Sequence, residues 1–209
     1  HYEGGLVQFI EYLTEAKEAI TPRVISIDNT RDDVVVDVAL QYNDSYSETI
    51  LSFVNNINTI DGGTHLSGFR TALTRTLNDY GRKAGILKEN ESNLTWEDVR
   101  EGLRAVVSVK VLEPQFEGQT KGKLGNSEVK GITDTIVSDG LRVFLEEHPA
   151  EAKKIIEKAT NASRAREAAR KARELTRRKN ALEVSSLPGK LADCSEKDTT
   201  MTEIYLVDG

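Results

Sequence analysis

Residues 34–42, V-V-V-D-V-A-L-Q-Y, decide the fold class, because every second position in them is apolar. The even-numbered positions from Val34 to Tyr42 would share one face of a strand, while Asp37 and Gln41 would lie on the other. This alternation predicts a β-strand with one buried face and one more polar face. The turn signal N-D-S at 43–45 follows, so we expect the next apolar run, at 50–54, to pair with this strand as a hairpin.

Helical periodicity flanks these strands. Apolar residues recur every three or four positions in residues 5–19, 64–84 and 129–144, which predicts three amphipathic helices. Thr64 is expected to cap the second helix, and Gly85 to end it. Further predicted elements are strands over 24–27 and 103–112, a capping box at 95–98, and a long basic helix over 150–179 that begins after Pro149.

A glycine-rich loop, G-Q-T-K-G-K-L-G at 118–125, follows the strand at 103–112. Its three glycines favour positive φ, and Gln119 and Lys121 would project an amide and a full charge. Such groups suit contact with a phosphate. The Walker A pattern G-x-x-x-x-G-K-[ST] is absent from the sequence, so this loop could contact a nucleotide but not cradle one alone. On pattern alone, an ordinary solvated loop is the favoured interpretation.

Composition favours a globular protein, with 38% hydrophobic and 30% charged residues. No run of 18 apolar residues exists, so no transmembrane helix is expected. The single cysteine, Cys194, excludes an internal disulfide and favours a reducing compartment, and we expect a cytoplasmic protein. The formal charge of −6 is uneven, because residues 150–179 carry 11 Lys and Arg against 4 Asp and Glu. A start without Met at His1 and an apolar run close to Gly209 suggest a fragment of a longer chain.

Seven stretches together resemble the B subunits of bacterial DNA gyrase, which are type IIA topoisomerases. They are H-Y-E-G-G-L at 1–6, V-A-L-Q-Y-N-D at 38–44, D-G-G-T-H-L-S-G-F-R at 61–70, R-E-G-L-R-A-V-V-S-V-K-V at 100–111, Q-T-K at 119–121, R-A-R-E-A-A-R-K-A-R-E at 164–174 and L-P-G-K-L-A-D-C at 187–194. The B subunit of topoisomerase IV shares several of them. The run at 61–70, followed by T-A-L-T-R-T-L, is more similar to gyrase.

The resemblance implies an α+β fold, in which residues 1–182 form a transducer domain. That domain has a ribosomal-protein-like β-α-β arrangement, with a mixed β-sheet, packed helices and a left-handed crossover. Residues 183–209 would be a linker and the first strand of a truncated TOPRIM domain. The implied function is the coupling of ATP hydrolysis to DNA strand passage and negative supercoiling, as part of an enzyme. We expect the fragment alone to be inactive, because ATP is held mainly by a neighbouring domain.

The resemblance also assigns individual residues. Lys121 would contact the γ-phosphate of ATP, Gln119 would support the nucleotide and the attacking water, and Thr120 would shape the loop. Arg70 would line a cavity that holds duplex DNA, and Arg75 is a weaker candidate that a solvated helix position explains better. Asp208 takes the place of the TOPRIM glutamate, a carboxylate that binds Mg²⁺ or acts in acid–base chemistry during strand cleavage. It is one methylene shorter, and the rest of that site is missing.

Expected partners are duplex DNA, the gyrase A subunit in a heterotetramer, and a second copy through the ATPase domain when ATP is bound; no membrane partner is expected. Two further hypotheses come from other classes of protein. The basic helix could make the chain a non-enzymatic nucleic-acid-binding module, although helices this charged are more often solvated or partly paired with acidic groups. A free-standing kinase-like ATPase is disfavoured, since no adenine or Mg²⁺ motif is present. The three histidines lack the spacing of a zinc site, and His65 is expected at the helix start or in the core.

Overall fold

The computed structural model describes residues 5–14, 18–88, 90–184 and 199–201, with the backbone alone described for 178–184 and 199. The elements in chain order are α1 (Gly5–Thr14), β1 (Ile25–Arg31), β2 (Val34–Tyr42), β3 (Thr49–Val54), β4 (Ile57–Asn58), β5 (Gly62–Gly63), α2 (Thr64–Lys83), α3 (Trp96–Val99), β6 (Leu103–Lys110), β7 (Phe116–Glu117), β8 (Lys123–Leu124), α4 (Ser127–Glu147), α5 (Pro149–Val184) and a 3₁₀ turn at Thr199–Met201. Contacts divide the chain into two compact units, His1–Arg164 and Ala165–Gly209, and each is described by itself.

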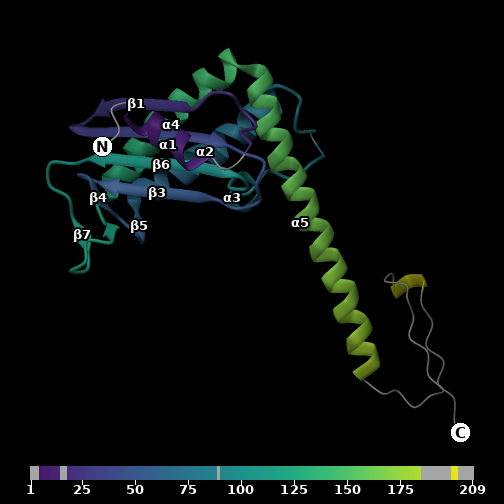
Figure 1. Cartoon of the computed structure of the whole chain (residues 1–209). Coiled ribbons are helices and arrows are strands. Elements are labelled where there is room, and N and C mark those ends of the chain that lie inside the picture. The colour runs from purple at the N-terminus through teal and green to yellow at the C-terminus, as the bar shows by residue number, and fades with distance from the viewer. Residues whose placement is uncertain (1–4, 15–17, 89, 185–198, 202–209) are drawn as a thin grey trace, which may run out of the picture. The chain divides into compact units, whose positions relative to one another are not determined.

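A five-stranded mixed sheet in the order β1-β2-β6-β3-β4 forms the centre of the first unit (Figure 1). β2 pairs antiparallel with β1 and with β6, whereas β3 runs parallel to β6 and antiparallel to β4. The even positions of β2 are all buried, which confirms the predicted alternation. β6 is buried on both faces, as its run of valines and its central place in the sheet require.

The predicted hairpin between the strands at 34–42 and 50–54 is wrong, because β6 lies between β2 and β3. After β2 the Asn43 side chain accepts hydrogen bonds from the N–H and the hydroxyl of Ser45, at 3.0 and 2.6 Å. The Asn43 N–H donates to the carbonyl of Gly102, directly before β6, at 3.0 Å. β3 forms its hairpin with β4 instead, through Asn55 and Asn56, which both take positive φ.

Helices cover both faces of the sheet. α2 and α4 pack on each other and on one face, whereas α1 packs on the opposite face (Figure 1). Phe69, Leu73 and Leu77 of α2 are fully buried in the larger core. A smaller core on the α1 side is centred on Ile10 and Val106. Full burial of each large apolar side chain contributes about 1.5–3 kcal/mol, so these two clusters fix the layer order.

Two helix boundaries differ from the prediction. The helix predicted over 5–19 is shorter, because the described residue Glu18 accepts a hydrogen bond from Asp44 and Ala19 bridges to Asn43. Thr64 does not cap α2. Gly63 holds the cap position, and the Thr64 hydroxyl is buried without a partner among the described residues.

Other boundaries are confirmed. Gly85, at φ +69°, ends α2, and its N–H donates to the Arg82 carbonyl at 3.1 Å. The capping box before α3 forms, with the Asp98 carboxylate accepting from the N–H of Thr95 at 2.8 Å. α4 ends before Pro149, which opens α5, as proline favours the first position of a helix.

The β-α-β unit expected from the family resemblance is present, since parallel β3 and β6 are connected through α2. The left-handed sense of this crossover stays a prediction. The predicted long basic helix is confirmed as α5, which begins in the first unit, and its side chains described from Ala165 onward, in the second unit, are exposed. No helix among the described residues is long and apolar enough to cross a lipid bilayer.

Candidate functional site

Residues 119–121 lie in the loop of a short hairpin between β7 and β8. Phe116 pairs with Leu124 and Glu117 with Lys123. The Lys123 Nζ lies 2.8 Å from Glu117 Oε2, and this hydrogen bond raises the pKa of the Lys123 ammonium. The pairing of β7 with β8 therefore fixes the two ends of the 119–121 loop.

The three side chains of the 119–121 loop are exposed to solvent. Gln119, Thr120 and Lys121 make no side-chain hydrogen bond or ion pair with any residue that the structure describes. The Lys121 ammonium is consequently available to an anion from outside this part of the chain. The loop is thus neither buried in the core nor held down by neighbouring acidic groups.

Lys121 has a left-handed backbone, with φ at +53°. The other four non-glycine residues with positive φ in the described ranges are Asp32, Asp33, Asn55 and Asn56. Asp and Asn tolerate this conformation in tight turns, whereas for a lysine it costs about 1–2 kcal/mol. Strain of this size at a non-Asx residue is typical of loops whose shape serves a ligand.

The expected role of the loop glycines is only partly confirmed. Gly118 takes φ +80°, but neither Gly122 nor Gly125 has positive φ, so the prediction is wrong for those two positions. Gly122 lies close to Asp61 instead, since a Cβ there would lie 2.7 Å from Oδ2 at the end of that flexible side chain. Sequence reasoning could not find this contact, since it joins two segments that are far apart in the chain.

The base of the loop is attached to the start of α2. β5 pairs in parallel with β8, and the N–H of Asp61 donates to the carbonyl of Gly122 at 2.9 Å. Gly63, at φ +139°, approaches the β8 backbone so closely that a Cβ would lie 2.5 Å from the N of Leu124. Gly63, in a backbone conformation that essentially only glycine adopts, therefore holds the cap position of α2 in place of Thr64. The D-G-G-T-H motif therefore anchors the Q-T-K motif.

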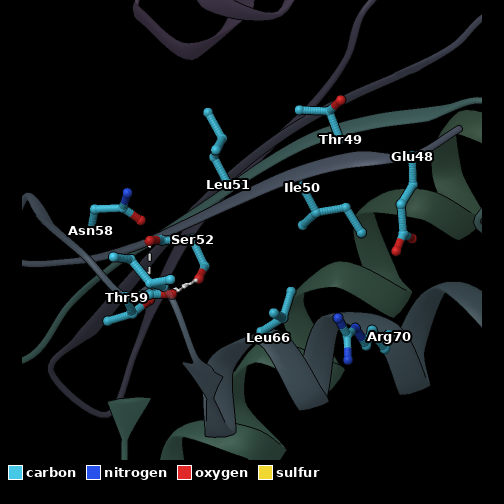
Figure 2. Close-up of a pocket in the computed structure, with 10 residues that line it drawn as sticks. Glu48, Thr49, Ile50, Leu51, Ser52, Asn58, Thr59, Leu66 and Arg70 are labelled. Carbon is cyan, nitrogen blue, oxygen red and sulfur yellow. Dashed lines mark hydrogen bonds between the residues drawn. The ribbon is translucent and has the colours of Figure 1, made fainter. Parts of the chain in front are cut away.

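Arg70, six residues after Thr64 on α2, lines a cavity of about 430 Å³ between α2 and the β3–β4 edge (Figure 2). Its guanidinium carbon lies 5.2 Å from the centre of the Trp96 ring, a cation–π contact. The side chain is exposed and makes no ion pair within the described residues. Glu48 lines the same cavity, but its Oε1 accepts from Arg100 at 2.8 Å. Arg70 therefore keeps its hydrogen-bond donors free for an external partner.

Arg75 is already engaged. Its guanidinium donates two parallel hydrogen bonds to the Asp134 carboxylate, at 3.0 and 2.9 Å, and one to the Ser138 hydroxyl at 2.9 Å. The bidentate pair connects α2 to α4. It favours the structural interpretation that the sequence already preferred for Arg75 over DNA contact.

Charges of the basic helix are partly paired where the structure describes them. Arg164 Nη2 lies 2.6 Å from Glu91 within the first unit, and this hydrogen bond lowers the pKa of the Glu91 carboxyl. In the second unit Lys171 pairs with Glu167, four residues before it, at 2.9 Å. Arg170 lies 3.9 Å from Glu174. These ion pairs favour the interpretation of the basic helix as a solvated segment over its interpretation as a helix that binds DNA phosphates.

Asp208 lies outside the described residues, as does Cys194. Within the described ranges no group of three or more His, Cys, Asp or Glu side chains could hold a metal ion. The Mg²⁺ implied by the resemblance therefore has no set of ligands among the described residues.

Sequence reasoning missed a buried polar network beside the loop. It consists of three almost fully buried residues, Ser52, Thr59 and His65. The Thr59 hydroxyl lies within hydrogen-bonding distance of both the Ser52 hydroxyl and the His65 ring. Burial lowers the pKa of His65 to about 4, so its imidazole is neutral near pH 7. His65 was correctly expected in the core, but its partners carry no periodic signal that would identify them.

Comparisons with known proteins agree on one family. A family model described as DNA gyrase B matches residues 5–175. The DNA gyrase B subunit from Clostridium acetobutylicum is 61% identical over 210 residues, which cover 100% of this chain and 33% of that protein. A DNA gyrase B subunit from Bacillus mycoides is 60% identical over 209 residues, covering 100% of this chain and 52% of that protein. The chain thus spans between a third and about half the length of these relatives.

Two solved structures have similar folds. The 43K ATPase domain of Thermus thermophilus gyrase B, in complex with an aminocoumarin, matches with a TM-score of 0.76 and 45% identity over 83% of this chain and 46% of that one. The topoisomerase IV ATP-binding domain of Francisella tularensis matches at a TM-score of 0.69 and 29% identity over 79% of this chain and 44% of that one. With a family model that covers most of its length and relatives of this identity, the chain belongs to the DNA gyrase B family.

Proposed function

We propose that this chain is the transducer segment of a gyrase B protein, and that it couples ATP hydrolysis to DNA strand passage and supercoiling. Residues 1–182 form the transducer domain in this proposal, and residues 183–209 begin a TOPRIM domain. Membership of the DNA gyrase B family supports it, as does the likeness to the structure of a gyrase B ATPase domain. The gyrase B subunits of Clostridium acetobutylicum and Bacillus mycoides, at 61% and 60% identity over the whole of this chain, support gyrase over topoisomerase IV.

The observation that carries the proposal is the exposed, unpaired Lys121 ammonium on a strained hairpin loop, as the described part of the chain has it. ATP, held by the ATPase domain of the same protein, supplies the phosphoryl group that is transferred to water. Lys121 donates to the γ-phosphate and stabilises the charge that develops on it, which is the main requirement of phosphoryl transfer. Gln119 orients the attacking water with its amide, and Thr120 sets the turn between the two.

The same contact makes the loop a sensor. After hydrolysis and phosphate release, Lys121 loses its anionic partner, and the loop can separate from the ATPase domain. Because β8 pairs with β5 at the start of α2, any displacement of the loop is transmitted to that helix. α2 carries Arg70, which we place at the DNA duplex as a phosphate contact without sequence preference.

The proposal includes three partners. They are duplex DNA, the gyrase A subunit in a heterotetramer, and a second copy of the B protein that joins through the ATPase domain. Mg²⁺ belongs to the complete enzyme. We place the protein in the cytoplasm. The rival interpretation as a nucleic-acid-binding module is less well supported, because Arg164, Arg170 and Lys171 of the basic helix already have acidic partners.

Replacing Lys121 with alanine in the full-length B protein, assembled with the A subunit, tests this function. ATP turnover and supercoiling should fall to about 1–10% of the wild-type rate, because a charge-assisted hydrogen bond in the transition state is worth about 1.5–3 kcal/mol, or about ten- to a hundredfold. DNA cleavage should be retained, since its chemistry lies elsewhere. Lys123→Ala is a matched control on the same hairpin, whose ammonium pairs with Glu117. Supercoiling at the wild-type rate in Lys121→Ala would refute the proposal.

A further inference from the structure

Ser52, Thr59 and His65 form a buried polar network between the sheet and the first turn of α2. Thr59 is its centre: its N–H donates to the Ser52 carbonyl at 2.8 Å, and its Oγ1 lies 2.7 Å from the Ser52 hydroxyl (Figure 2). The Ser52 hydroxyl also lies 2.8 Å from the Thr59 carbonyl, to which it can donate. His65 Nε2 lies 3.3 Å from Thr59 Oγ1. All three residues are no more than 4% exposed, and a buried polar group that loses its partner is costly.

The protonation of this network follows from burial. His65 Nδ1 has no partner among the described residues. A buried N–H without an acceptor is costly, and the neutral imidazole carries only one proton, so the proton belongs on Nε2. His65 then donates to Thr59 Oγ1, and the Thr59 hydroxyl donates to the Ser52 carbonyl, 3.0 Å away.

Thr59 also fixes the start of the loop anchor. Its carbonyl accepts from the N–H of Gly62 at 2.9 Å, which closes the turn that leads into β5. β5 and the neighbouring Asp61 N–H hold β8, and β8 carries the 119–121 loop. A continuous set of backbone contacts therefore runs from Thr59 to the residue next to Lys121.

We propose that Thr59, held by Ser52 and His65, is a positioning residue for Lys121. Thr59 touches no nucleotide. Thr59 fixes the position of β5 relative to the five-stranded sheet. Because β5 pairs with β8, Thr59 thereby also fixes the position of the Lys121 ammonium. This proposal rests on the proposed function, because it assigns Thr59 an effect on ATP hydrolysis through Lys121. An error of about 1 Å in such a placement can reduce a rate about a hundredfold.

A double-mutant cycle in the full-length B protein, assembled with the A subunit, tests the proposal. Thr59→Val keeps the shape and removes the hydroxyl; it should lower kcat/KM for ATP about tenfold. Thr59→Ser should restore most of the rate. Combined with Lys121→Ala, Thr59→Val should have no further effect, because the group that it positions is gone. Thr133→Val is the matched control, since Thr133 is fully buried and its hydroxyl has no partner in the described part of the chain.

A fall in kcat/KM of equal size with and without Lys121 would overturn the proposal, as would a wild-type rate for Thr59→Val. Should Lys121→Ala itself keep the wild-type rate, the proposed function fails instead, and the cycle separates the two results. Hydrogen exchange supplies a second measure that does not need activity. The Asp61 amide donates to the carbonyl of Gly122. Its hydrogen exchange should be about tenfold faster in Thr59→Val than in the wild type, and its exchange rate should be unchanged in Thr133→Val. Equal protection of Asp61 in both variants would likewise contradict the proposal.

Discussion

Gly63→Ala is expected to destabilise the protein strongly, for two separate reasons. The backbone of Gly63 lies at φ +139°, a region that costs an alanine about 1–3 kcal/mol. Its new Cβ would lie 2.5 and 2.6 Å from the backbone N and O of Leu124. Relieving such an overlap against backbone costs about 1–3 kcal/mol more, because neither strand can move without breaking the β5–β8 pairing. The expected total is about 2–6 kcal/mol.

Two other glycines separate these causes. Gly118 also has positive φ, at +80°, but no heavy atom lies within 4 Å of its added Cβ, so Gly118→Ala should cost only the strain, about 1 kcal/mol. Gly131 lies inside α4 with open space around it, and Gly131→Ala should stabilise by up to about 1 kcal/mol.

Urea denaturation of the 209-residue chain, followed by circular dichroism, gives the three free energies of unfolding. The expected order of stability is Gly131→Ala above wild type, then Gly118→Ala, then Gly63→Ala. A cost for Gly63→Ala within about 0.5 kcal/mol of that for Gly118→Ala would refute the close approach of β5 and β8, since this difference is what the overlap should add.

Three further predictions use other contacts. The pKa of His65 is lowered from 6.5 to about 4 in the folded chain, so stability is complete above about pH 6.5 and should fall by about 3 kcal/mol as the pH drops toward 4; His65→Gln should flatten this part of a pH series of denaturation curves. Arg75→Met should cost about 0.5–1 kcal/mol, Asp134→Asn a similar amount, and the double variant less than the sum, since both remove one half-exposed ion pair; additive free energies would contradict the pairing. In the full-length protein, Arg70→Gln should weaken DNA stimulation of the ATPase, more strongly at low salt, and a salt-independent loss would contradict a phosphate contact.

Local patterns predicted much of this fold correctly. The alternation in β2, the apolar stripe of α2 and the breaks at Gly85 and Pro149 are properties of short segments, and the structure confirms each. The strand order could not be read in the same way. β6 enters between β2 and β3 from far along the chain, and a turn signal after β2 carries no information about that strand.

In the candidate site, too, local features could be predicted from the sequence, whereas contacts between distant segments could not. The exposure of the 119–121 loop follows from residue types that favour loops, whereas positive φ was expected at three glycines and occurs only at Gly118. The partner of Arg75 could not be identified, because Asp134 lies 59 residues away on another helix. The failure of Thr64 as a helix cap has the same origin, since the backbone of Leu124 determines what stands before it. Contacts between distant segments, rather than local propensity, decided each of these positions.

The most direct test of the proposed mechanism compares nucleotide affinities of the full-length B protein with and without the Lys121 ammonium. If Lys121 contacts the γ-phosphate, Lys121→Ala should weaken binding of a non-hydrolysable ATP analogue about ten- to a hundredfold and leave ADP binding unchanged, because ADP lacks that group. Calorimetric titration measures both. Equal loss for the two nucleotides, or no loss for either, would contradict the claim that this chain completes an active site held by another domain.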